Sequence, residues 1–378
     1  MAKRFSIIQR EPLMLAGLVV VIAVFFSLTT FAAHAYHRKQ EQYAVRWYQR
    51  GEDALKRSRP ADAVEDFRNA LAYSRDNDLY RLRLAQALMA DQRPQEARAH
   101  LLSLWEREPG DGTINLELAR LAVMWGDTPQ AVRYYHAAIY GVWPQDPEEH
   151  RLQIRFELSE YLLHRHTVQD AKDAEAELVA LAAELPPQDA AGQTRLGTML
   201  LEAGLYARAL AAFRNALNEQ PNLMSALEGA GEAAFRMGEY HAARLYLLPV
   251  VAQKPEDQHT VELLDLSELV LKLDPFLRGL SSRERARRAL RDMQLGLARA
   301  QKCSPSPQAA PADKSLAALL QQAKSMAPSE KLLARDPDAV AQTMDLAFKL
   351  EKAAAPCGPP GLEDKALILL AAQQEAAR

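Results

Sequence analysis

Residues 196–221 read LGTMLLEAGLYARALAAFRNALNEQP, and this stretch decides how the chain folds. It carries two small residues, Gly197 and Ala209, twelve positions apart, and a large residue, Phe213, four positions after the second. Two antiparallel helices approach closely where both carry a small residue, and a large side chain fills the space beside that contact. Gly204 lies between the two apolar segments, which predicts a turn there. The stretch therefore predicts a pair of packed helices.

The same pattern recurs along much of the chain with a period of 34 residues, which is typical of stacked helical hairpins. The small residue at the centre of each unit is an alanine: Ala63, Ala97, Ala131, Ala209 and Ala243. A large residue follows each alanine after four positions: Phe67, Leu101, Tyr135, Phe213 and Leu247. A small residue precedes each alanine by twelve positions: Gly51, Ala85, Ala119, Gly197 and Gly231. Five units in one register predict a stack of helix pairs.

These residues resemble the tetratricopeptide repeat family, whose motif has Trp, Leu, Gly and Tyr on a first helix and Ala, Phe, Ala and Pro on a second. The first unit carries Trp47, Gly51, Ala63, Phe67 and Ala70, and the fifth carries Leu196, Gly197, Ala209, Phe213, Ala216 and Pro221. The resemblance covers roughly residues 44–256 and departs from the motif at the Tyr position, which holds Ala or Leu. It implies an all-α solenoid of about six helical hairpins.

The fourth unit, roughly Pro147–Pro187, is out of phase because about ten extra residues separate the third unit from the fifth. We expect the extra length in the loop Tyr140–Glu148, which contains Trp143, and in the turn near residues 164–170. An insertion in a repeat array maps to a loop on one face, often a binding face. A simple irregularity in the stacking explains the same pattern.

The composition indicates what class of protein this is. The chain has 378 residues, 48% of them hydrophobic, and a formal net charge of −3. This length allows a large core and more than one structural unit. A slightly acidic chain does not have the basic surface that a nucleic-acid-binding protein needs.

The apolar segment Leu13–Ala33 contains no charged residue and predicts a single transmembrane helix. As a helix it spans about 30 Å, which is the thickness of the hydrocarbon core. A cleaved signal peptide is the alternative, because Ala33-His34-Ala35 fits a cleavage site. Basic residues flank the segment on both sides, so the charge bias is small. We expect export of everything after residue 36, which makes a single-pass membrane protein with a periplasmic or otherwise extracytoplasmic C-terminal domain.

These features divide the chain into four regions. Residues 1–36 form a cytoplasmic tail and anchor, and residues 37–256 form the repeats, whose first helix can continue directly from the membrane helix. Residues 257–303 are expected to form capping helices, since the end of a repeat array needs a cap. Residues 304–378 hold a Pro-rich linker and a small C-terminal helical region.

A basic helix is expected at residues 281–302. Its arginines include Arg283, Arg287, Arg288 and Arg291, which make a candidate contact with anionic headgroups or an acidic partner. The alternative is a solvated face whose arginine stems cover apolar neighbours.

The chain has two cysteines, Cys303 and Cys357, and each lies beside a proline-rich turn. In an oxidising compartment, a disulfide between them would contribute roughly 4 kcal/mol to the free energy of unfolding. In a cytoplasmic domain they would be two free thiols. Two cysteines without a histidine at ligand spacing do not make a zinc site, so no metal is expected.

The resemblance implies that the first helices of successive repeats line the concave side of the array. Each repeat in register contributes two matching positions: Tyr48 and Glu52, Leu82 and Gln86, Leu116 and Arg120, Thr194 and Thr198, and Glu228 and Glu232. They predict a groove that is apolar in the N-terminal repeats and acidic in the last. Such a groove suits an extended or helical segment of a partner protein with basic character.

No catalytic, phosphate-binding or dinucleotide-binding motif occurs in the sequence. The expected function is therefore a membrane-anchored, non-catalytic scaffold without cofactor or small-molecule substrate, which holds partner proteins at the membrane in envelope assembly or quality control. Two alternatives stay open: a cytoplasm-facing regulatory subunit of a membrane enzyme, and a lipid-surface module that acts through the basic helix.

Overall fold

The computed structural model describes residues 10–165, 167–303 and 312–377, and those residues form helices joined by short loops, with no strand among them. The chain divides into two compact units, Met1–Leu158 and Ser159–Arg378. The α-helices are α2 (Arg10–Lys56), α3 (Pro60–Tyr73), α4 (Asp78–Ala90), α5 (Pro94–Trp105), α6 (Gly112–Met124), α7 (Thr128–Ile139), α8 (Pro147–Leu163), α9 (Val168–Glu184), α10 (Ala190–Glu202), α11 (Tyr206–Glu219), α12 (Met224–Arg236), α13 (Tyr240–Gln253), α14 (Gln258–Leu273), α15 (Ser282–Lys302), α16 (Ala312–Met326), α17 (Glu330–Leu333), α18 (Pro337–Ala353) and α19 (Leu362–Ala377). The basic tail residues Lys3 and Arg4 and residues 304–311 of the Pro-rich linker lie outside the described residues.

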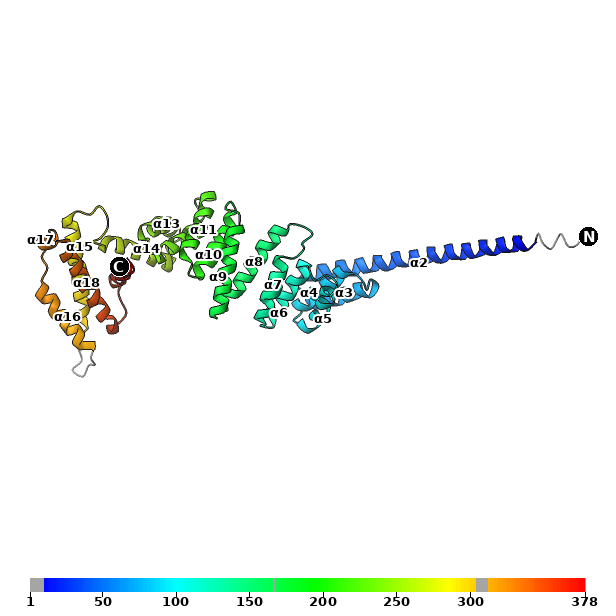
Figure 1. Cartoon of the computed structure of the whole chain (residues 1–378), viewed down its shortest axis with the longest axis horizontal. Coiled ribbons are helices and arrows are strands. Elements are labelled where there is room, and N and C mark those ends of the chain that lie inside the picture. Colours follow the sequence, from blue (N-terminus) through cyan, green and yellow to red (C-terminus); the bar gives the residue numbers. More distant parts are fainter. Residues whose placement is uncertain (1–9, 166, 304–311, 378) are drawn as a thin grey trace, which may run out of the picture. The chain divides into compact units, whose positions relative to one another are not determined.

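Six consecutive helix pairs occupy the middle of the sequence, which confirms the predicted all-α repeat fold (Figure 1). The pairs are α2–α3, α4–α5, α6–α7, α8–α9, α10–α11 and α12–α13. In each pair that keeps the 34-residue register, the central alanine is fully buried: Ala63, Ala97, Ala131, Ala209 and Ala243. The alanines therefore lie at the packed centre of each hairpin.

The small-against-large contact predicted from residues 196–221 is present in the structure. A Cβ atom added at Gly197 would lie 2.7 Å from the nearest ring carbon of Phe213. A Cβ atom added at Gly51 would lie 2.7 Å from the nearest ring carbon of Phe67. The glycine thus leaves room for an aromatic ring at the helix contact. Both phenylalanine rings are buried.

The turn inside each hairpin that keeps the 34-residue register has one residue in the left-handed region. Gly204 adopts a φ of 76° there, but the same repeat position holds Ser58 (φ 55°) and Gln92 (φ 58°) in the first two repeats. A non-glycine residue in this region is under backbone strain. The turn geometry is therefore kept even where the sequence does not supply glycine.

Helix α2 is a single 47-residue helix that joins the apolar segment to the first repeat (Figure 1). Its C-terminal part packs against α3, and its residues from Met14 to Thr29 are exposed. The linker between the two regions is thus helical. Among the described residues, α2 is the helix that is long and apolar enough to cross a membrane.

The loop after α7, which the sequence analysis singled out as an insertion, is folded against the third repeat. The Trp143 indole Nε1 donates to the Ala138 carbonyl at 2.8 Å, and its ring stacks on His150. The Gly112 amide donates to the Val142 carbonyl at 3.0 Å. The loop is therefore an ordered part of the first unit, and it exposes the side chains of Tyr140 and Val142.

The last helices of the second unit share a core of their own. Helix α15 packs on α18 and α16, through Met293, Ala300, Leu316, Leu346 and Leu350. Helix α19 returns to pack along α14. Of the two helices that the sequence analysis grouped as a cap, α14 thus covers the last repeat, whereas α15 belongs mainly to the C-terminal bundle.

Candidate protein-binding surface

The repeat register assigns each predicted groove residue to the first helix of a pair. We call the surface made by these positions the first-helix face. In the first unit it lies on α2, α4, α6 and the start of α8, and in the second unit on α10, α12 and α14. The two units use these positions differently.

In the first unit, side chains on the first-helix face bind one another from repeat to repeat. The Arg83 Nε lies 3.1 Å from the Glu52 carboxylate, and an Arg83 Nη1 donates to the Gln86 amide oxygen at 2.9 Å. The Gln86 amide then donates to Glu117 at 2.8 Å. Arg120 continues this chain, since its Nη1 lies 3.1 Å from the same Glu117 carboxylate. We call this chain of contacts the polar ladder.

The polar ladder ends in a bidentate ion pair. Arg120 donates through Nε and Nη2 to both oxygens of Glu157, at 2.9 and 2.8 Å. The Tyr135 hydroxyl donates to the same carboxylate at 2.9 Å. Hydrogen bonding to Glu157 raises the pKa of Arg120 further above its ordinary value. Planar two-point pairing of this kind fixes geometry as well as charge. The ladder therefore joins neighbouring repeats of the first unit.

The apolar members predicted for this part of the groove turn toward the protein core. Leu116 is buried, and Tyr48 and Leu82 are half-buried and pack against the core cluster of the first repeats. The ring of Tyr48 stacks on Tyr80 at a centroid distance of 5.0 Å. The expectation of an apolar groove here is wrong, because these side chains fill the contacts between helices. The face that remains is the polar ladder.

In the second unit, the first-helix face is more open. Thr194 and Thr198 bond only to carbonyls one turn earlier on α10, and Thr198 is exposed. Glu232 lies 3.2 Å from Arg236 on its own helix and 3.7 Å from His259. Glu228 is half-exposed and has no ion pair or hydrogen bond among the described residues. An acidic surface is therefore left partly unpaired.

Helix α19 approaches this acidic surface at its far end. Glu262 lies on α14, at the repeat position that Glu228 occupies on α12, and it forms an ion pair with Lys365 of α19. At the other end of α19, the Gln373 amide donates to the Gly238 carbonyl at 3.4 Å. Lys365 and Glu262 lie near the starts of α19 and α14, and Gln373 and Gly238 lie near or just after the ends of α19 and α12. Helix α19 therefore runs in the same direction as α12 and α14. A helix of the chain itself thus covers one stretch of the first-helix face.

Comparison with protein families identifies the repeats. The tetratricopeptide repeat model matches at two places, residues 54–111 and residues 194–258. Both matches fall on helix pairs whose register and buried alanines are described above. This chain is a tetratricopeptide-repeat protein.

Solved tetratricopeptide-repeat structures are similar to this chain at low identity, and no curated protein sequence matches it. YrrB, described as a TPR protein with an unusual peptide-binding site, has 17% identity and a TM-score of 0.40, with 52% of this chain and 97% of YrrB covered. Pseudomonas aeruginosa PilF has 14% identity and a TM-score of 0.42, with 59% and 97% covered. PilW, a type IV pilus biogenesis factor, has 18% identity and a TM-score of 0.32, with 52% and 83% covered. Likeness at this level carries no information on function.

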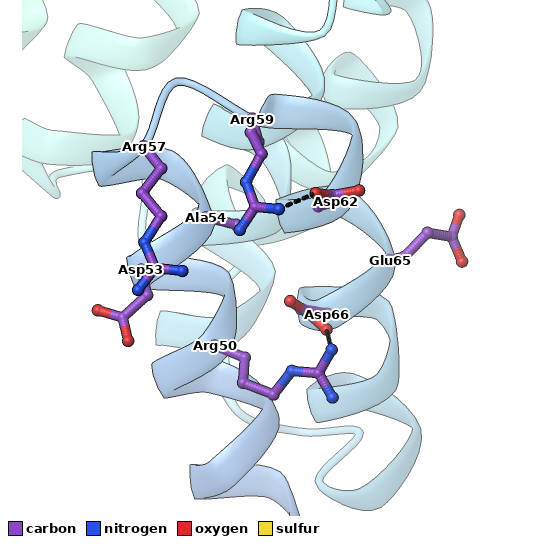
Figure 2. Close-up of a pocket in the computed structure, with 8 residues that line it drawn as sticks. All are labelled: Arg50, Asp53, Ala54, Arg57, Arg59, Asp62, Glu65 and Asp66. Carbon is purple, nitrogen blue, oxygen red and sulfur yellow. Dashed lines mark ion pairs between the residues drawn. The ribbon is translucent and has the colours of Figure 1, made fainter.

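A hollow of about 430 Å³ lies at the start of the tetratricopeptide repeats, between α2 and α3 (Figure 2). Arg50 reaches the buried carboxylate of Asp66 at 3.5 Å, and Arg59 pairs with Asp62 at 3.2 Å (Figure 2). Burial raises the pKa of Asp66 in spite of Arg50. The hollow thus has a charged lining that is largely paired within itself.

The repeat register explains this charged hollow. In the later repeats the positions of Arg50 and Asp53 hold buried apolar residues: Leu84 and Ala87, Leu118 and Leu121, Leu196 and Met199, Ala230 and Ala233. There a helix of the preceding repeat covers them, whereas α2 has no preceding repeat among the described residues. Terminal repeats need a polar outer face. The hollow is therefore the solvated end of the array, and nothing in it indicates a ligand.

Arginines of the basic helix, α15, bind acids and backbone carbonyls of the same unit. Arg288 donates to the carbonyls of Leu271 and Asp274 at the end of α14, at 2.8 and 3.0 Å. Arg291 pairs with Glu363, and Arg283 and Arg287 both face Glu330: the N–O distances are 2.8, 3.3 and 3.4 Å. These contacts support the alternative in which the arginines bind groups of their own unit. Arg283 and Arg287 nevertheless stay 76% and 58% exposed, so a contact with an anionic surface stays a prediction.

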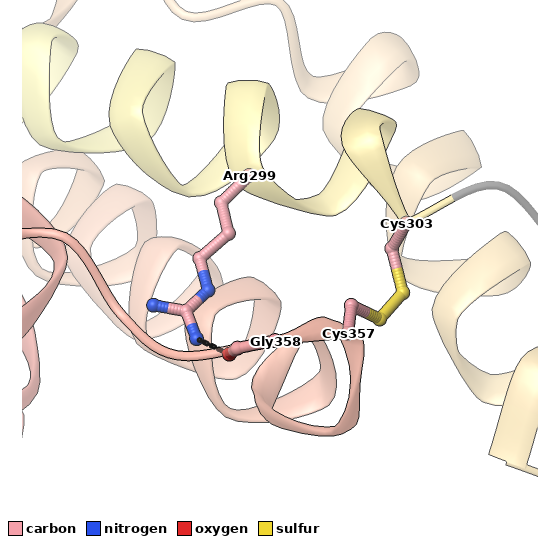
Figure 3. The surroundings of a disulfide bond; sticks show 4 residues. All are labelled: Arg299, Cys303, Cys357 and Gly358. Atoms are coloured by element: carbon pink, nitrogen blue, oxygen red, sulfur yellow. Dashed lines mark hydrogen bonds between the residues drawn. A yellow bond between two sulfur atoms is a disulfide. The ribbon is translucent and has the colours of Figure 1, made fainter.

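Cys303 and Cys357 form a disulfide that joins the end of α15 to the turn after α18, with Cα atoms 5.4 Å apart (Figure 3). The neighbouring Arg299 donates to the Gly358 carbonyl at 3.2 Å and lies 2.6 Å from the buried Glu351 carboxylate. Asp364 of α19 lies 3.2 Å from the same guanidinium. The disulfide and Arg299 together hold the loop that leads into α19.

Several residues of these networks were not predicted from the sequence. Arg83, Glu117 and Glu157 of the polar ladder were not singled out, although acids and arginines recur on the first helices. Asp292 of the basic helix was not singled out either, yet it is fully buried. No group of three His, Cys, Asp or Glu side chains that could hold a metal occurs within residues 10–165, 167–303 and 312–377.

Proposed function

We propose that this protein is a membrane-anchored, non-catalytic scaffold whose second unit captures a partner protein on the acidic first-helix face. The partner would contribute an amphipathic helix or extended segment that carries Lys or Arg. Such a segment can lay its apolar side in a groove and meet the acids with its charge. The scaffold would hold its partners close to the membrane.

The contact between α14 and α19 carries this proposal. Lys365 of α19 meets Glu262, and Glu228 occupies the same position one repeat earlier without a partner of its own. Helix α19 buries Ala366, Leu367 and Leu370. The chain thus contains one example of a helix that packs on this surface and meets one of its acids with a Lys. A partner helix of the same chemistry would extend the contact to α12 and α10.

The anchor is proposed from α2. Its apolar segment is exposed and long enough to cross a bilayer, and it continues without a break into the first repeat. A rigid helical connection would keep the array within a short distance of the bilayer. Partners are therefore expected among membrane proteins or chains that pass close to the membrane.

An extracytoplasmic location of the repeats is proposed from the Cys303–Cys357 pair, since disulfides persist in oxidising compartments. Thiol labelling in intact cells tests it. Protection of both cysteines until reductant is added supports export. Free labelling in folded protein would instead favour the cytoplasm-facing regulatory subunit.

Site-specific crosslinking tests the proposed surface. A photoreactive amino acid at Thr198, which is exposed on the first-helix face, should capture a partner, and the combined change Glu228→Lys and Glu232→Lys should abolish that capture. Charge reversal acts on affinity, and neither Glu228 nor Glu232 is buried in the core. The thermal unfolding midpoint of the variant serves as a check of the fold.

Matched controls make this experiment specific. The same crosslinker at Ala211, which is exposed on α11, should capture nothing in common with Thr198. The change Glu219→Lys reverses a charge at the end of α11, away from the first-helix face, and should leave capture unchanged. Equal loss with Glu219→Lys would mean that overall charge, rather than this surface, decides binding.

A further inference from the structure

Aromatic and aliphatic side chains gather at one end of the first two repeats. Tyr43 and Val45 on α2, Tyr73 at the end of α3 and Leu79 on α4 are 46%, 39%, 40% and 48% exposed. The rings of Tyr43 and Tyr73 lie 5.5 Å apart, so the two helices bring them to the same level. We call these four residues the apolar end patch. Neither the polar ladder nor the acidic face includes them.

The repeat register shows that this patch is a special feature of the end nearest the apolar segment. At the position of Tyr43 the next repeats have Asn77, Asp111 and Asp189, whose side chains cap the N-termini of α4, α6 and α10. At the position of Tyr73 the later repeats have Arg107, Gly141, Glu219 and Gln253. Val45 and Leu79 occupy one repeat position, and the later repeats have Thr113, Ala191 and Ser225 there. Among the later repeats that keep the register, the sixth has a large apolar residue at the position of Tyr43, Leu223. At these repeat positions, large apolar side chains are therefore found mainly where α2 leaves the array.

The direction of α2 places this patch toward the membrane. Helix α2 runs from its apolar segment into the first repeat, α3 runs back antiparallel to it, and the loop between α3 and α4 therefore returns toward the apolar segment. Tyr43 comes ten residues after Ala33, which corresponds to about 15 Å along a helix. The headgroup region extends roughly 5–8 Å beyond the hydrocarbon core. Side chains on α2 and α4 incline toward the helix N-terminus, which here is the membrane side.

Charge around the patch favours an anionic surface. Arg38, Lys39, Arg46 and Arg75 are exposed in the segments around it, against Glu41 and Asp76, while Asp78 is paired with Arg107. Tyrosine and basic residues together are typical of segments that lie at the membrane interface. A transmembrane helix tilted by about 20° toward α3 and α4 lowers this corner of the array onto the headgroups.

We propose that the apolar end patch and the α3–α4 loop dock on the headgroup layer of the bilayer into which α2 inserts. This inference rests on the proposed anchor. Docking would fix the tilt of α2 and the direction in which the array leaves the membrane.

Spin labels on the full-length chain in nanodiscs test the proposal. The discs contain zwitterionic and anionic phospholipid and a small fraction of lipid with a nickel-chelating headgroup, and no other protein. Single cysteines replace Ala35, Arg75 or Ala90 in a chain whose native cysteines are serine. Ala35 reports the end of the anchor, Arg75 the α3–α4 loop, and Ala90 the opposite end of α4.

The three labels separate docking from anchoring. Docking predicts that nickel lipid enhances the relaxation of the labels at 35 and 75 several-fold and leaves the label at 90 unchanged. Enhancement at 35 alone would overturn docking and leave the anchor standing, and would assign the patch to a protein partner. No enhancement at 35 would overturn both proposals.

Substitutions taken from the chain's own repeats sharpen this test. Tyr43→Asn, Tyr73→Arg and Leu79→Thr copy Asn77, Arg107 and Thr113, which fit the same backbone positions. The triple variant should lose the enhancement at 75 and keep it at 35. An unchanged enhancement at 75 would show that these side chains do not hold the loop at the membrane.

Discussion

The first-helix faces of the two units occupy the same repeat positions and differ in how their charges are used. In the first unit, Arg83, Gln86, Glu117 and Arg120 bind one another and Glu157, so the face is satisfied internally. In the second unit, Glu228 has no partner among the described residues. The difference teaches that a repeat position does not by itself define a binding surface. What matters is whether neighbouring repeats have already used its charges.

The largest expected effect concerns an acid of the second unit that has no partner. Asp292 on α15 is fully buried, and neither carboxylate oxygen has a hydrogen bond among the described groups. Burial raises its pKa to about 8, the neighbouring Asp274 also raises it, and Arg291 and Arg288 lower it. The folded state therefore binds this proton more tightly than the unfolded chain. The contribution of Asp292 to the free energy of unfolding is complete below about pH 4 and is lost as the pH rises to about 8.

Asp292→Asn should remove that dependence. We expect the free energy of unfolding of the second unit to rise by about 2–5 kcal/mol at pH 8 and to change little at pH 4, because a neutral amide replaces a buried charge. Chemical denaturation at both pH values measures this. An equal effect at the two pH values would mean that Asp292 of the folded protein keeps one protonation state, neutral or ionised, at both pH values.

Breaking the polar ladder should cost less. Arg120→Met keeps the side chain's length and leaves Glu117 and Glu157 without their shared cation. We expect the free energy of unfolding of the first unit to fall by about 1–3 kcal/mol, a range that is discounted because Arg120 is 42% exposed. The control Arg244→Met removes an exposed pair with Glu268 and should cost less than about 1 kcal/mol. Equal costs would mean that the ladder adds nothing beyond ordinary surface pairs.

The helix contact inside a repeat can be altered and restored. Gly197→Ala places a Cβ 2.7 Å from the ring of Phe213 and should cost about 1–3 kcal/mol, because a packed core resists an added carbon. Adding Phe213→Leu reproduces the Ala85 and Leu101 pair of the second repeat and should recover at least half of that loss. Thermal unfolding of the single and double variants measures the coupling. Additive losses would contradict the proposed complementarity.

The smallest effect is expected at the hairpin turn of the second repeat. Gln92→Gly relieves a residue at φ 58° and should gain about 0.5–1 kcal/mol, since glycine adopts this region without strain. At Gly204, where φ is 76°, the change to Ala should lose a similar amount. A loss with Gln92→Gly would show that the glutamine side chain compensates for the strain.

The sequence predicted the repeats well because their packing depends on residue size at fixed spacing. Ala209, Phe213 and Gly204 each appear in the structure where the period requires them. The polar ladder was harder to predict, since the period assigns Glu52 and Gln86 to a face without saying which arginine reaches them. Leu116 was misassigned because a first helix packs on two sides, and a single position can turn toward either.

The basic helix shows a second limit of sequence reasoning. The partners of Arg283, Arg291 and Arg299 are Glu330, Glu363 and Glu351, which come from helices far along the chain. Only the folded bundle brings them together. A run of arginines therefore looks unpaired in the sequence and is paired in the structure.

The most direct test of the account compares crosslinking from Gln86 and Thr198, which occupy the same repeat position in the two units. A photoreactive amino acid is introduced at each position of the full-length protein in native membranes. The account predicts that Thr198 captures a partner and that Glu228→Lys weakens this capture at least tenfold, while Gln86 captures none. Capture of the same partner from both positions would contradict the claim that the polar ladder closes the first unit and leaves binding to the second.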